Sequence, residues 1–309
     1  MSSAPHTASK PGLAKPERRR SPWQQLVADF AHSPAAMGAL IVAILLILAA
    51  IFAPLITPQN PYDLMQLDVL DARLPPGSMN GAATHAYWLG TDGQGRDLYS
   101  AMLYGLRLSL SVGLGSAIIE GVIGTVFGLT AAYMGGRVDS LIMRLVDLLL
   151  AFPSILVAMM LLAFLGKSVT NVVLTLVLIE WAYYARTARA QALIEARREY
   201  VEAARSLAIP NWRIVLVHIL PNCLPPLIVV GTLQVARAIT LEATLSFLGL
   251  GVPITEPSLG LLIANGYQTM LSGEYWISVY PGIALLAVLV SINMVGDRLR
   301  ELLNPRFVK

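Results

Sequence analysis

The sequence has little charge and almost no cysteine. Charged residues make up 13% of its 309 residues, about half the share usual for a soluble domain, whereas hydrophobic residues make up 56%. So few charges cannot cover the surface of a soluble globule, which excludes a cytoplasmic enzyme and a disordered chain and indicates a membrane protein. The single cysteine, Cys223, excludes an intrachain disulfide framework and a zinc site built on several thiolates.

Motifs of enzyme active sites are also missing. Residues 166–168 read Gly-Lys-Ser, like the end of a phosphate loop, but position 161 is leucine where that loop needs its first glycine. The four histidines form no HExxH pair, and no G-x-S-x-G nucleophile turn occurs. We therefore expect a chain that is not an enzyme, that holds no cofactor or metal of its own, and that has no nucleic-acid partner.

Long apolar segments, by contrast, are abundant. A helix needs about 20 mostly apolar residues to cross the hydrocarbon core, because each residue advances it by about 1.5 Å. The first such segment is too long, and begins too far into the chain, to be a cleaved signal peptide. The sequence thus predicts an all-α membrane protein with six transmembrane helices. The predicted spans are 37–56, 108–134, 148–165, 168–185, 214–236 and 276–296.

Lysine and arginine gather on one side of these spans. Of the 22 basic residues, 17 fall in the N-terminal tail, in the loops after the second and fourth spans, and in the C-terminal tail. Because short cytoplasmic loops carry the excess of Lys and Arg, both termini are expected in the cytoplasm. An even number of spans agrees with that orientation.

The spans divide the chain into four parts. Residues 1–34 are expected to be a disordered cytoplasmic tail, most clearly over the Pro-, Ser- and Arg-rich residues 1–21. Residues 35–105 supply the first transmembrane helix and a periplasmic segment. Residues 106–297 form the core, with five transmembrane helices, and residues 298–309 form a cytoplasmic C-terminal tail.

The loop 185–222, on the basic side, is the most informative segment. Its first part lacks glycine and proline and is rich in helix formers, so it predicts a helix up to Ala208 that ends where Pro210 disfavours helix at Ile209. Either a groove on a partner or the inner membrane surface could cover its apolar stripe, and periodicity favours neither. The stripe consists of Tyr200, Ala203, Ala204 and Leu207.

Within this loop, Glu202-Ala203-Ala204 and the later Leu220-Pro221 resemble the EAA loop of bacterial ABC importer permeases. That family's pattern is EAA, three residues, Gly, nine residues, Ile, one residue and Leu-Pro, and the spacing here is the same. Ala208 stands at the Gly position and His218 at the Ile position. The run His218 to Asn222 resembles the dipeptide/oligopeptide/nickel branch of the family.

Other segments resemble the same branch. Residues 89–97 are similar to its LGTD-x-x-GRD signature, and residues 296–306 to its GD-x-LRD-x-LDP ending, with Asn304 in place of Asp. The resemblance covers about residues 35–309 and implies a "C"-type permease subunit with the type I ABC importer fold. The signature residues carried over are Gly90, Asp92, Gly95, Arg96 and Asp97.

The resemblance also implies partners and a function. It implies a bacterial inner-membrane protein that pairs with a paralogous permease, docks two ATPase subunits that bind ATP and Mg, and receives substrate from a solute-binding protein. Dipeptides or oligopeptides are the first expected substrates, with nickel, glutathione and related solutes as alternatives. The loop would couple the ATPases to the spans, with Glu202 as the chief docking residue. The coupling residues carried over are Glu202, Ala203, Ala204, Ala208, Pro210, Leu220 and Pro221.

The residue pattern of segment 89–97 also has a purely structural interpretation. Gly93 and Gly95 permit a tight turn, and either Asp92 or Asp97 can pair with Arg96. We favour a self-contained structural turn, and the alternative is a contact with substrate or with a binding protein.

Three acidic residues lie within or beside predicted spans. Glu120, Asp147 and Glu180 are candidates for the translocation path, because charges at bilayer depth are costly and usually face protein or water. Pairing with Arg144 and a position near the interface are the alternatives. A secondary transporter with Glu120 and Glu180 as proton sites is a rival function, but it leaves the Glu202 loop unexplained.

Overall fold

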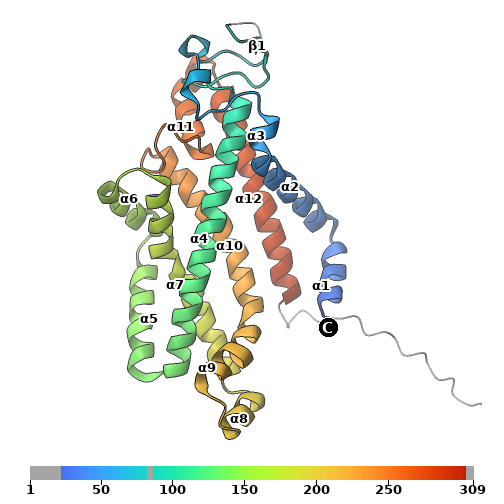
Figure 1. Ribbon diagram of the computed structural model, residues 1–309, viewed down its shortest axis with the longest axis vertical. Helices are drawn as coiled ribbons and strands as arrows, with labels where there is room; N and C mark the ends of the chain where they lie inside the picture. Colours follow the sequence, from blue (N-terminus) through green and yellow to red (C-terminus); the bar gives the residue numbers. More distant parts are fainter. Residues whose placement is uncertain (1–21, 82–85, 304–309) are drawn as a thin grey trace, which may run out of the picture.

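The computed structural model describes residues 22–81 and 86–303, so residues 1–21, 82–85 and 304–309 lie outside it. The described chain is an elongated bundle of helices with a cap at one end and short helices at the other (Figure 1). The helices of the bundle are α1 (Pro22–Ala31), α2 (Pro34–Ile51), α4 (Leu98–Met134), α5 (Gly136–Ala151), α6 (Ser154–Leu165), α7 (Val169–Glu195), α10 (Leu220–Phe247) and α12 (Trp276–Leu303).

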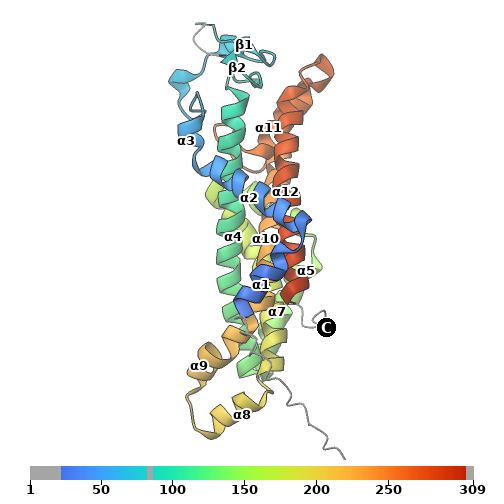
Figure 2. The same ribbon diagram turned by 90° about the vertical axis from the view of Figure 1, so that its right-hand side faces the viewer.

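Short elements gather at the two ends of this bundle (Figure 2). We call the segment 57–97 the cap. One end holds the cap, whose elements are η1 (Leu64–Gln66), η2 (Val69–Asp71), β1 (Ser78–Met79) and β2 (Ala86–Tyr87). Helix α3 (Ala53–Ile56) leads into the cap, and α11 (Leu259–Thr269) and η4 (Met270–Ser272) lie beside it. The other, which we call the α8 end, holds α8 (Glu199–Ser206), α9 (Asn211–Arg213) and the π-helical segment η3 (Ile214–Ile219).

The cap contains the one sheet of the described residues. Strands β1 and β2 pair antiparallel, with Ser78 opposite Tyr87 and Met79 opposite Ala86. Both strands are two residues long. The fold is therefore all-helical apart from this short hairpin, as the sequence predicts.

Helices α4 and α7 form the most extensive helix pair of the bundle. A Cβ atom at Gly124 would collide with the carbonyl oxygen of Trp181, and one at Gly128 with that of Ala185. Small residues at these positions thus let the two backbones approach closely, as in other membrane helix pairs. Not every glycine of α4 does this, since Gly115 faces open space.

Four helices of the described residues are long and apolar enough to cross a membrane. They are α2, α4, the continuous run Asn211–Phe247 that ends in α10, and α12. The pair α5 and α6 adds a fifth span if the two are counted together. Helix α7 does not meet the same criterion, so the described residues support four or five of the six predicted spans.

The predicted third span, 148–165, is wrong as a single helix. The chain breaks at Phe152 and Pro153, and α5 and α6 meet there at 91°. Phe152 has extended backbone angles (φ −96°, ψ 144°). The physical reason is Pro153, which disfavours the helical conformation of the residue before it.

The predicted element boundaries also need correction. The division between residues 105 and 106 falls inside α4, which begins earlier because Asp97 caps it. Helix α10 continues past residue 236 to Phe247 and thereby takes in Arg237 and Glu242, two residues predicted to lie outside the spans. The predicted tail 1–34 contains helix α1, so it is not disordered over residues 22–31.

Candidate functional sites

Helix α8 carries the Glu202-Ala203-Ala204 motif and lies beyond the end of the bundle (Figure 1). The predicted helix 185–208 is wrong as one element, because the chain leaves helix at Ala196 to Arg198 and restarts as α8. Val201 and Ala204 are buried against Ile214, Ile219 and Cys223. One face of α8 therefore anchors the helix to its own chain.

The opposite face of α8 is exposed. Glu202 and Ala203 are exposed, Leu207 is 76% exposed, and Trp212 of α9 is 65% exposed. The predicted stripe is thus divided between two faces, with Ala204 inside and Ala203 and Leu207 outside. Exposed apolar side chains next to an acidic residue make a surface suited to binding another protein.

The turn after α8 uses an alanine where glycine would be favoured. Ala208 has a positive φ of 53°. The N–H of Ile209 donates to the carbonyl of Ala204 at 3.2 Å, and the N–H of Ala208 to that of Arg205 at 2.9 Å. These two bonds form a Schellman motif, which ends a helix at a left-handed residue. The tight turn is therefore kept although the family's glycine is absent.

Tyr200 ties α8 to both flanking helices. Its hydroxyl donates to Glu195 Oε2 of α7 at 2.6 Å and accepts from Asn222 Nδ2 of α10 at 3.2 Å. Asn222 also donates to the carbonyl of His218 at 2.8 Å. Burial of the ring, followed by the bond to Glu195, raises the pKa of Tyr200 to about 12. The hydroxyl therefore stays protonated and joins three elements at one atom.

The remaining residues of the motif lie on the chain between α8 and α10. Pro210 precedes the first residue of α9, and its carbonyl accepts from the N–H of Ile214. Leu220 and Pro221 form the first turn of α10, directly after the π-helical segment η3. Proline is tolerated in a first turn because its missing N–H has no helical partner there.

Two of the three predicted path acids come together inside the bundle. Glu120 of α4 and Glu180 of α7 are each no more than 1% exposed. Glu180 Oε2 lies 3.1 Å from Arg237 Nε and accepts from Gln234 Nε2 at 3.2 Å. Among the described residues, Glu180 Oε1 and both carboxylate oxygens of Glu120 have no hydrogen-bond partner. Arg237 was missed from the sequence because the predicted span ended at residue 236, and Gln234, inside that span, carries no charge that would have marked it.

Asp147, the third predicted path acid, lies elsewhere. Its side chain is 67% exposed and pairs with Arg186 of α7 at 2.6 Å, rather than with Arg144. A second pair joins the same two helices, because Asp139 of α5 accepts two hydrogen bonds from Arg189. These pairs fasten α5 to α7 and do not contact Glu120 or Glu180.

A further acid, Glu242 of α10, is fully buried near the cap end. It accepts from Ser109 of α4 at 2.9 Å and from Ser246 at 2.8 Å, so both of its oxygens are occupied. Its partners mark it as a link between α4 and α10. The described residues contain no group of three or more His, Cys, Asp or Glu that could hold a metal ion.

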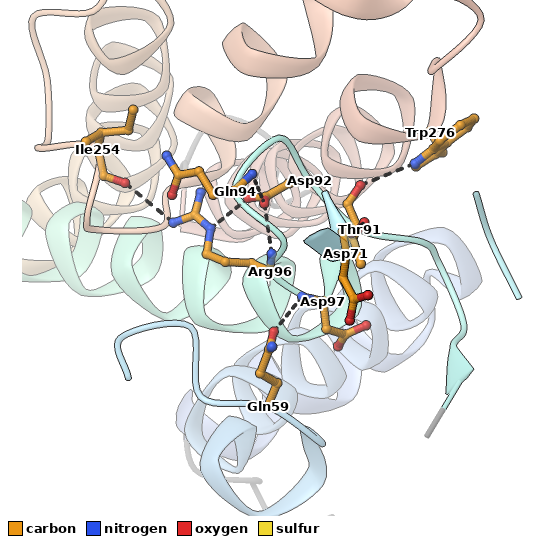
Figure 3. Close-up of polar contacts among 9 residues, drawn as sticks. All are labelled: Gln59, Asp71, Thr91, Asp92, Gln94, Arg96, Asp97, Ile254 and Trp276. Carbon is orange, nitrogen blue, oxygen red and sulfur yellow. Dashed lines mark hydrogen bonds and ion pairs between the residues drawn. The ribbon is translucent and has the colours of Figure 1, made fainter. Parts of the chain in front are cut away.

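The predicted signature at 89–97 forms a largely buried turn in the cap, which we call the signature turn (Figure 3). Asp92 and Arg96 pair at 2.7 Å and are both 1% exposed. The same carboxylate accepts from the backbone N–H groups of Gln94 and Arg96 at 2.8 and 3.0 Å. Arg96 pairs with Asp92, therefore, and Asp97 has a different role.

Asp97 caps α4 and also holds a distant part of the cap. Its carboxylate accepts from the N–H of Ser100 at 2.8 Å, and its own N–H donates to Gln59 Oε1 at 2.6 Å. Trp276 of α12 donates to the carbonyl of Thr91 at 3.4 Å (Figure 3). The signature turn thus joins the cap to the beginnings of α4 and α12.

Glycine is required at two positions of the signature turn. Gly90 and Gly95 have positive φ angles of 82° and 75°. A Cβ at Gly95 would collide with the carbonyl oxygen of Asp68, and one at Gly90 would lie 2.6 Å from that of Leu74. Both the backbone conformation and the close approach therefore exclude a side chain.

Comparison with known proteins identifies the family. Residues 124–309 match the model of the binding-protein-dependent transport system inner membrane component, and residues 21–76 match the N-terminal transmembrane domain of oligopeptide transport permease C. The di/tripeptide transport system permease protein DppC of Pseudomonas aeruginosa is 37% identical over 99% of this chain and 97% of its own.

Two further relatives and one solved structure extend the comparison. The probable D,D-dipeptide transport system permease protein DdpC of Escherichia coli is 37% identical over 89% of this chain and 88% of its own. The glutathione transport system permease protein GsiD of Escherichia coli is 34% identical over 95% of this chain and 94% of its own.

The fold is similar to that of an inward-facing MetNI methionine ABC transporter chain. The TM-score is 0.54, with 20% identity over 65% of this chain and 96% of that chain. The matched models and the relatives together settle the family. The chain belongs to the inner membrane components of binding-protein-dependent transport systems, and within them to the C-type permeases of peptide ABC importers.

Proposed function

We propose that this chain is the C-type permease subunit of an ATP-driven importer of dipeptides or oligopeptides in a bacterial inner membrane. Support comes from relatives named for dipeptide and di/tripeptide transport that match it over nearly its whole length. A relative named for glutathione, itself a short peptide, makes glutathione the second candidate. Nickel and other small solutes are further alternatives.

The observation that carries the coupling role is the shape of the α8 end. Helix α8 is anchored on one face, tied at Tyr200, and exposed at Glu202, Ala203 and Leu207. Such a helix suits a cleft of an ATPase subunit, whose closure on ATP would move α7 and α10 through it. ATP and Mg would then be bound by the partner subunits.

The proposed assembly contains two permeases, two ATPases and a solute-binding protein. Both termini and α8 would lie in the cytoplasm, with the cap outside. Helix α7 would be a sixth span, because its neighbours α4 and α10 run alongside it for most of its length. Its charges Glu180 and Arg189 are paired with other helices, which lowers the cost of placing them at depth.

The substrate is tested by uptake of labelled alanyl-alanine and of labelled nickel ion, in cells with and without this chain. Loss of alanyl-alanine uptake alone is the expected result. Loss of nickel uptake alone would contradict the peptide assignment. A secondary transporter would show uptake that uncouplers abolish and ATP depletion leaves intact.

The coupling role is tested by Glu202→Lys. We expect peptide uptake to fall at least tenfold while the amount of chain in the membrane is unchanged, because Glu202 is exposed and makes no side-chain contact that holds the fold. Glu301→Lys, at an exposed position near the end of α12, is the matched control. Normal uptake by the Glu202 variant would refute the docking role.

A further inference from the structure

Arg237 lies in the second half of α10, well before its end, yet part of it is exposed. It stands ten residues before the end of the helix at Phe247, about 15 Å at the rise of an α-helix. Its side chain is 39% exposed, although Ala236 and Ala238 on either side are buried. An arginine at this depth is costly against lipid and is found where it faces protein or water. Its exposed face therefore borders a polar path or another protein surface.

The chain holds this guanidinium in one orientation. Glu180 Oε2 lies 3.1 Å from Nε, and the carbon of the guanidinium lies 4.4 Å from the centre of the Tyr183 ring. Among the described residues, the two terminal nitrogens of Arg237 make no hydrogen bond. Arginine thus offers a planar pair of donors, already oriented, whose geometry matches a carboxylate.

A groove begins one helical turn from Arg237, on the side toward the α8 end. It has a volume of about 390 Å³ and lies between α7, α10 and α12. Thr187 lines it four residues after Tyr183, and Leu233 lines it four residues before Arg237, so Arg237 and Tyr183 lie about one helical turn beyond these lining residues, on the same helix faces. The polar lining includes Thr187 and Gln191, and the one charged residue among the lining residues is Arg300.

The charges along this groove favour an anionic ligand. Arg300 lines the groove, and Arg237 stands one helical turn beyond the lining residue Leu233. Glu180 is 1% exposed and lies behind Arg237, so it orients the guanidinium without presenting its own charge to the groove. Glu120 faces the same pair from α4 and is fully buried.

We propose that Arg237 binds the free carboxylate of the transported peptide inside the membrane, with Glu180 and Tyr183 as positioning residues. The groove toward Arg300 is the next part of the path. This inference rests on the proposed function and adds to it a substrate-binding residue and the chemical group that it recognises.

The experiment measures binding to the assembled transporter, purified in detergent without its solute-binding protein. Saturation-transfer NMR follows two probes, alanyl-alanine and its C-terminal amide. The wild-type complex should bind alanyl-alanine at least tenfold more tightly than the amide, because a carboxylate forms charged hydrogen bonds with arginine and the amide does not.

Four variants make the test specific. Arg237→Gln should weaken alanyl-alanine binding at least tenfold and leave the amide unchanged, and Arg237→Lys should have an intermediate effect. The double variant Glu180→Gln/Arg237→Gln removes the pair without leaving a buried charge, so it keeps the test valid if the single variant is unstable. Arg186→Gln, at an exposed ion-paired arginine of α7 away from the groove, should bind like the wild type.

Three results would overturn the inference. The first is unchanged alanyl-alanine binding in an intact Arg237→Gln or double-variant complex. The second is equal binding of acid and amide by the wild type. The third is separation of the two permeases in the double variant during size-exclusion chromatography, which would place a partner's carboxylate at Arg237.

Uptake in cells separates this inference from the function on which it rests. If cells with the wild-type chain import no labelled alanyl-alanine, the proposed function is wrong. If they import it, and cells with the double variant import it at the same rate, only the role of Arg237 is wrong.

Discussion

The cap and the α8 end are held together by different contacts. In the cap, Asp92, Arg96 and Asp97 are polar, almost completely buried and bonded to one another or to nearby backbone. At the α8 end, Leu207 and Trp212 are apolar and largely exposed. The buried charges of the cap are paired within this chain, but the cap also leaves apolar side chains exposed, among them Met65 (95%), Leu70 (88%) and Trp88 (69%). The two ends therefore differ in the contacts that hold them together, and both present apolar surface that a partner could cover.

Positive φ angles occur at both ends. The cap places glycine at Gly90 and Gly95, where close backbone contacts also exclude a side chain, and it holds Arg73 at a φ of 61°. The α8 end places Ala208 at a positive φ. Substitutions can therefore test whether each end is built for stability or for coupling.

The largest expected effect is that of Asp92→Ala. It leaves Arg96 buried without its partner, which costs about 3–5 kcal/mol of unfolding free energy. Thermal unfolding of the purified complex should show a Tm lowered by several degrees. Asp63→Ala, at the half-buried N-cap residue of the short helix η1, is the control and should change the Tm little, because it leaves no buried charge unpaired. An unchanged Tm for Asp92→Ala would show that the cap does not depend on this pair.

Gly95→Ala should have the next largest effect. The new methyl group must displace the backbone at Asp68, and the alanine must keep a positive φ. We therefore expect the unfolding free energy to fall by about 2–3 kcal/mol. Gly273→Ala is the matched control, since Gly273 is in the left-handed region (φ 93°, ψ 0°) with open space around it, and should cost about 1 kcal/mol. Equal Tm changes in the two variants would mean that close contact in the cap has no energetic importance.

Tyr200→Phe should separate coupling from stability. Loss of two hydrogen bonds at a partly exposed hydroxyl costs about 1 kcal/mol, which leaves the fold intact. Because the link between α7, α8 and α10 is broken, peptide transported per ATP hydrolysed should fall several-fold in proteoliposomes. Tyr267→Phe, at an exposed tyrosine of α11, should leave this ratio unchanged. A normal ratio for Tyr200→Phe would assign the hydroxyl a structural role alone.

The smallest expected effect is a gain. Ala208→Gly relieves a positive φ and should raise the unfolding free energy by about 1 kcal/mol. Ala190→Gly, at an exposed position inside α7, should lower it by about the same amount. If both variants are destabilised, the turn after α8 gains nothing from glycine.

Some features of the fold followed directly from the sequence. Apolar length predicted α2, α4 and α12, because a membrane helix must bond its backbone internally over about 20 residues. The break at Phe152 also had a local signal in Pro153. The signal for the α8 end was the spacing between Glu202-Ala203-Ala204 and Leu220-Pro221. For Arg96, the sequence left two possible partners, Asp92 and Asp97.

Other features had no local signal. The chain leaves helix between Ala196 and Arg198 without glycine or proline, because packing of Val201 and Ala204 against α10 overrides helix propensity. Glu180 and Arg237 are far apart in sequence, so only the packing of α7 on α10 brings them together. Asp147 was grouped with Glu120 and Glu180 by its sequence position, although α5 turns it toward the surface.

The π-helical segment η3 stands where the α8 end joins α10. Its hydrogen bonds run from residue i to i+5, so it winds more loosely than the α-helix that follows and holds one extra residue relative to it. Deleting one residue from Ile214–Ile219 would let the segment rewind as α-helix and would turn α8 by about 100° relative to α10. The length of this segment therefore sets the direction in which α8 faces relative to the membrane bundle. It does so independently of the residues that form α8 or the bundle.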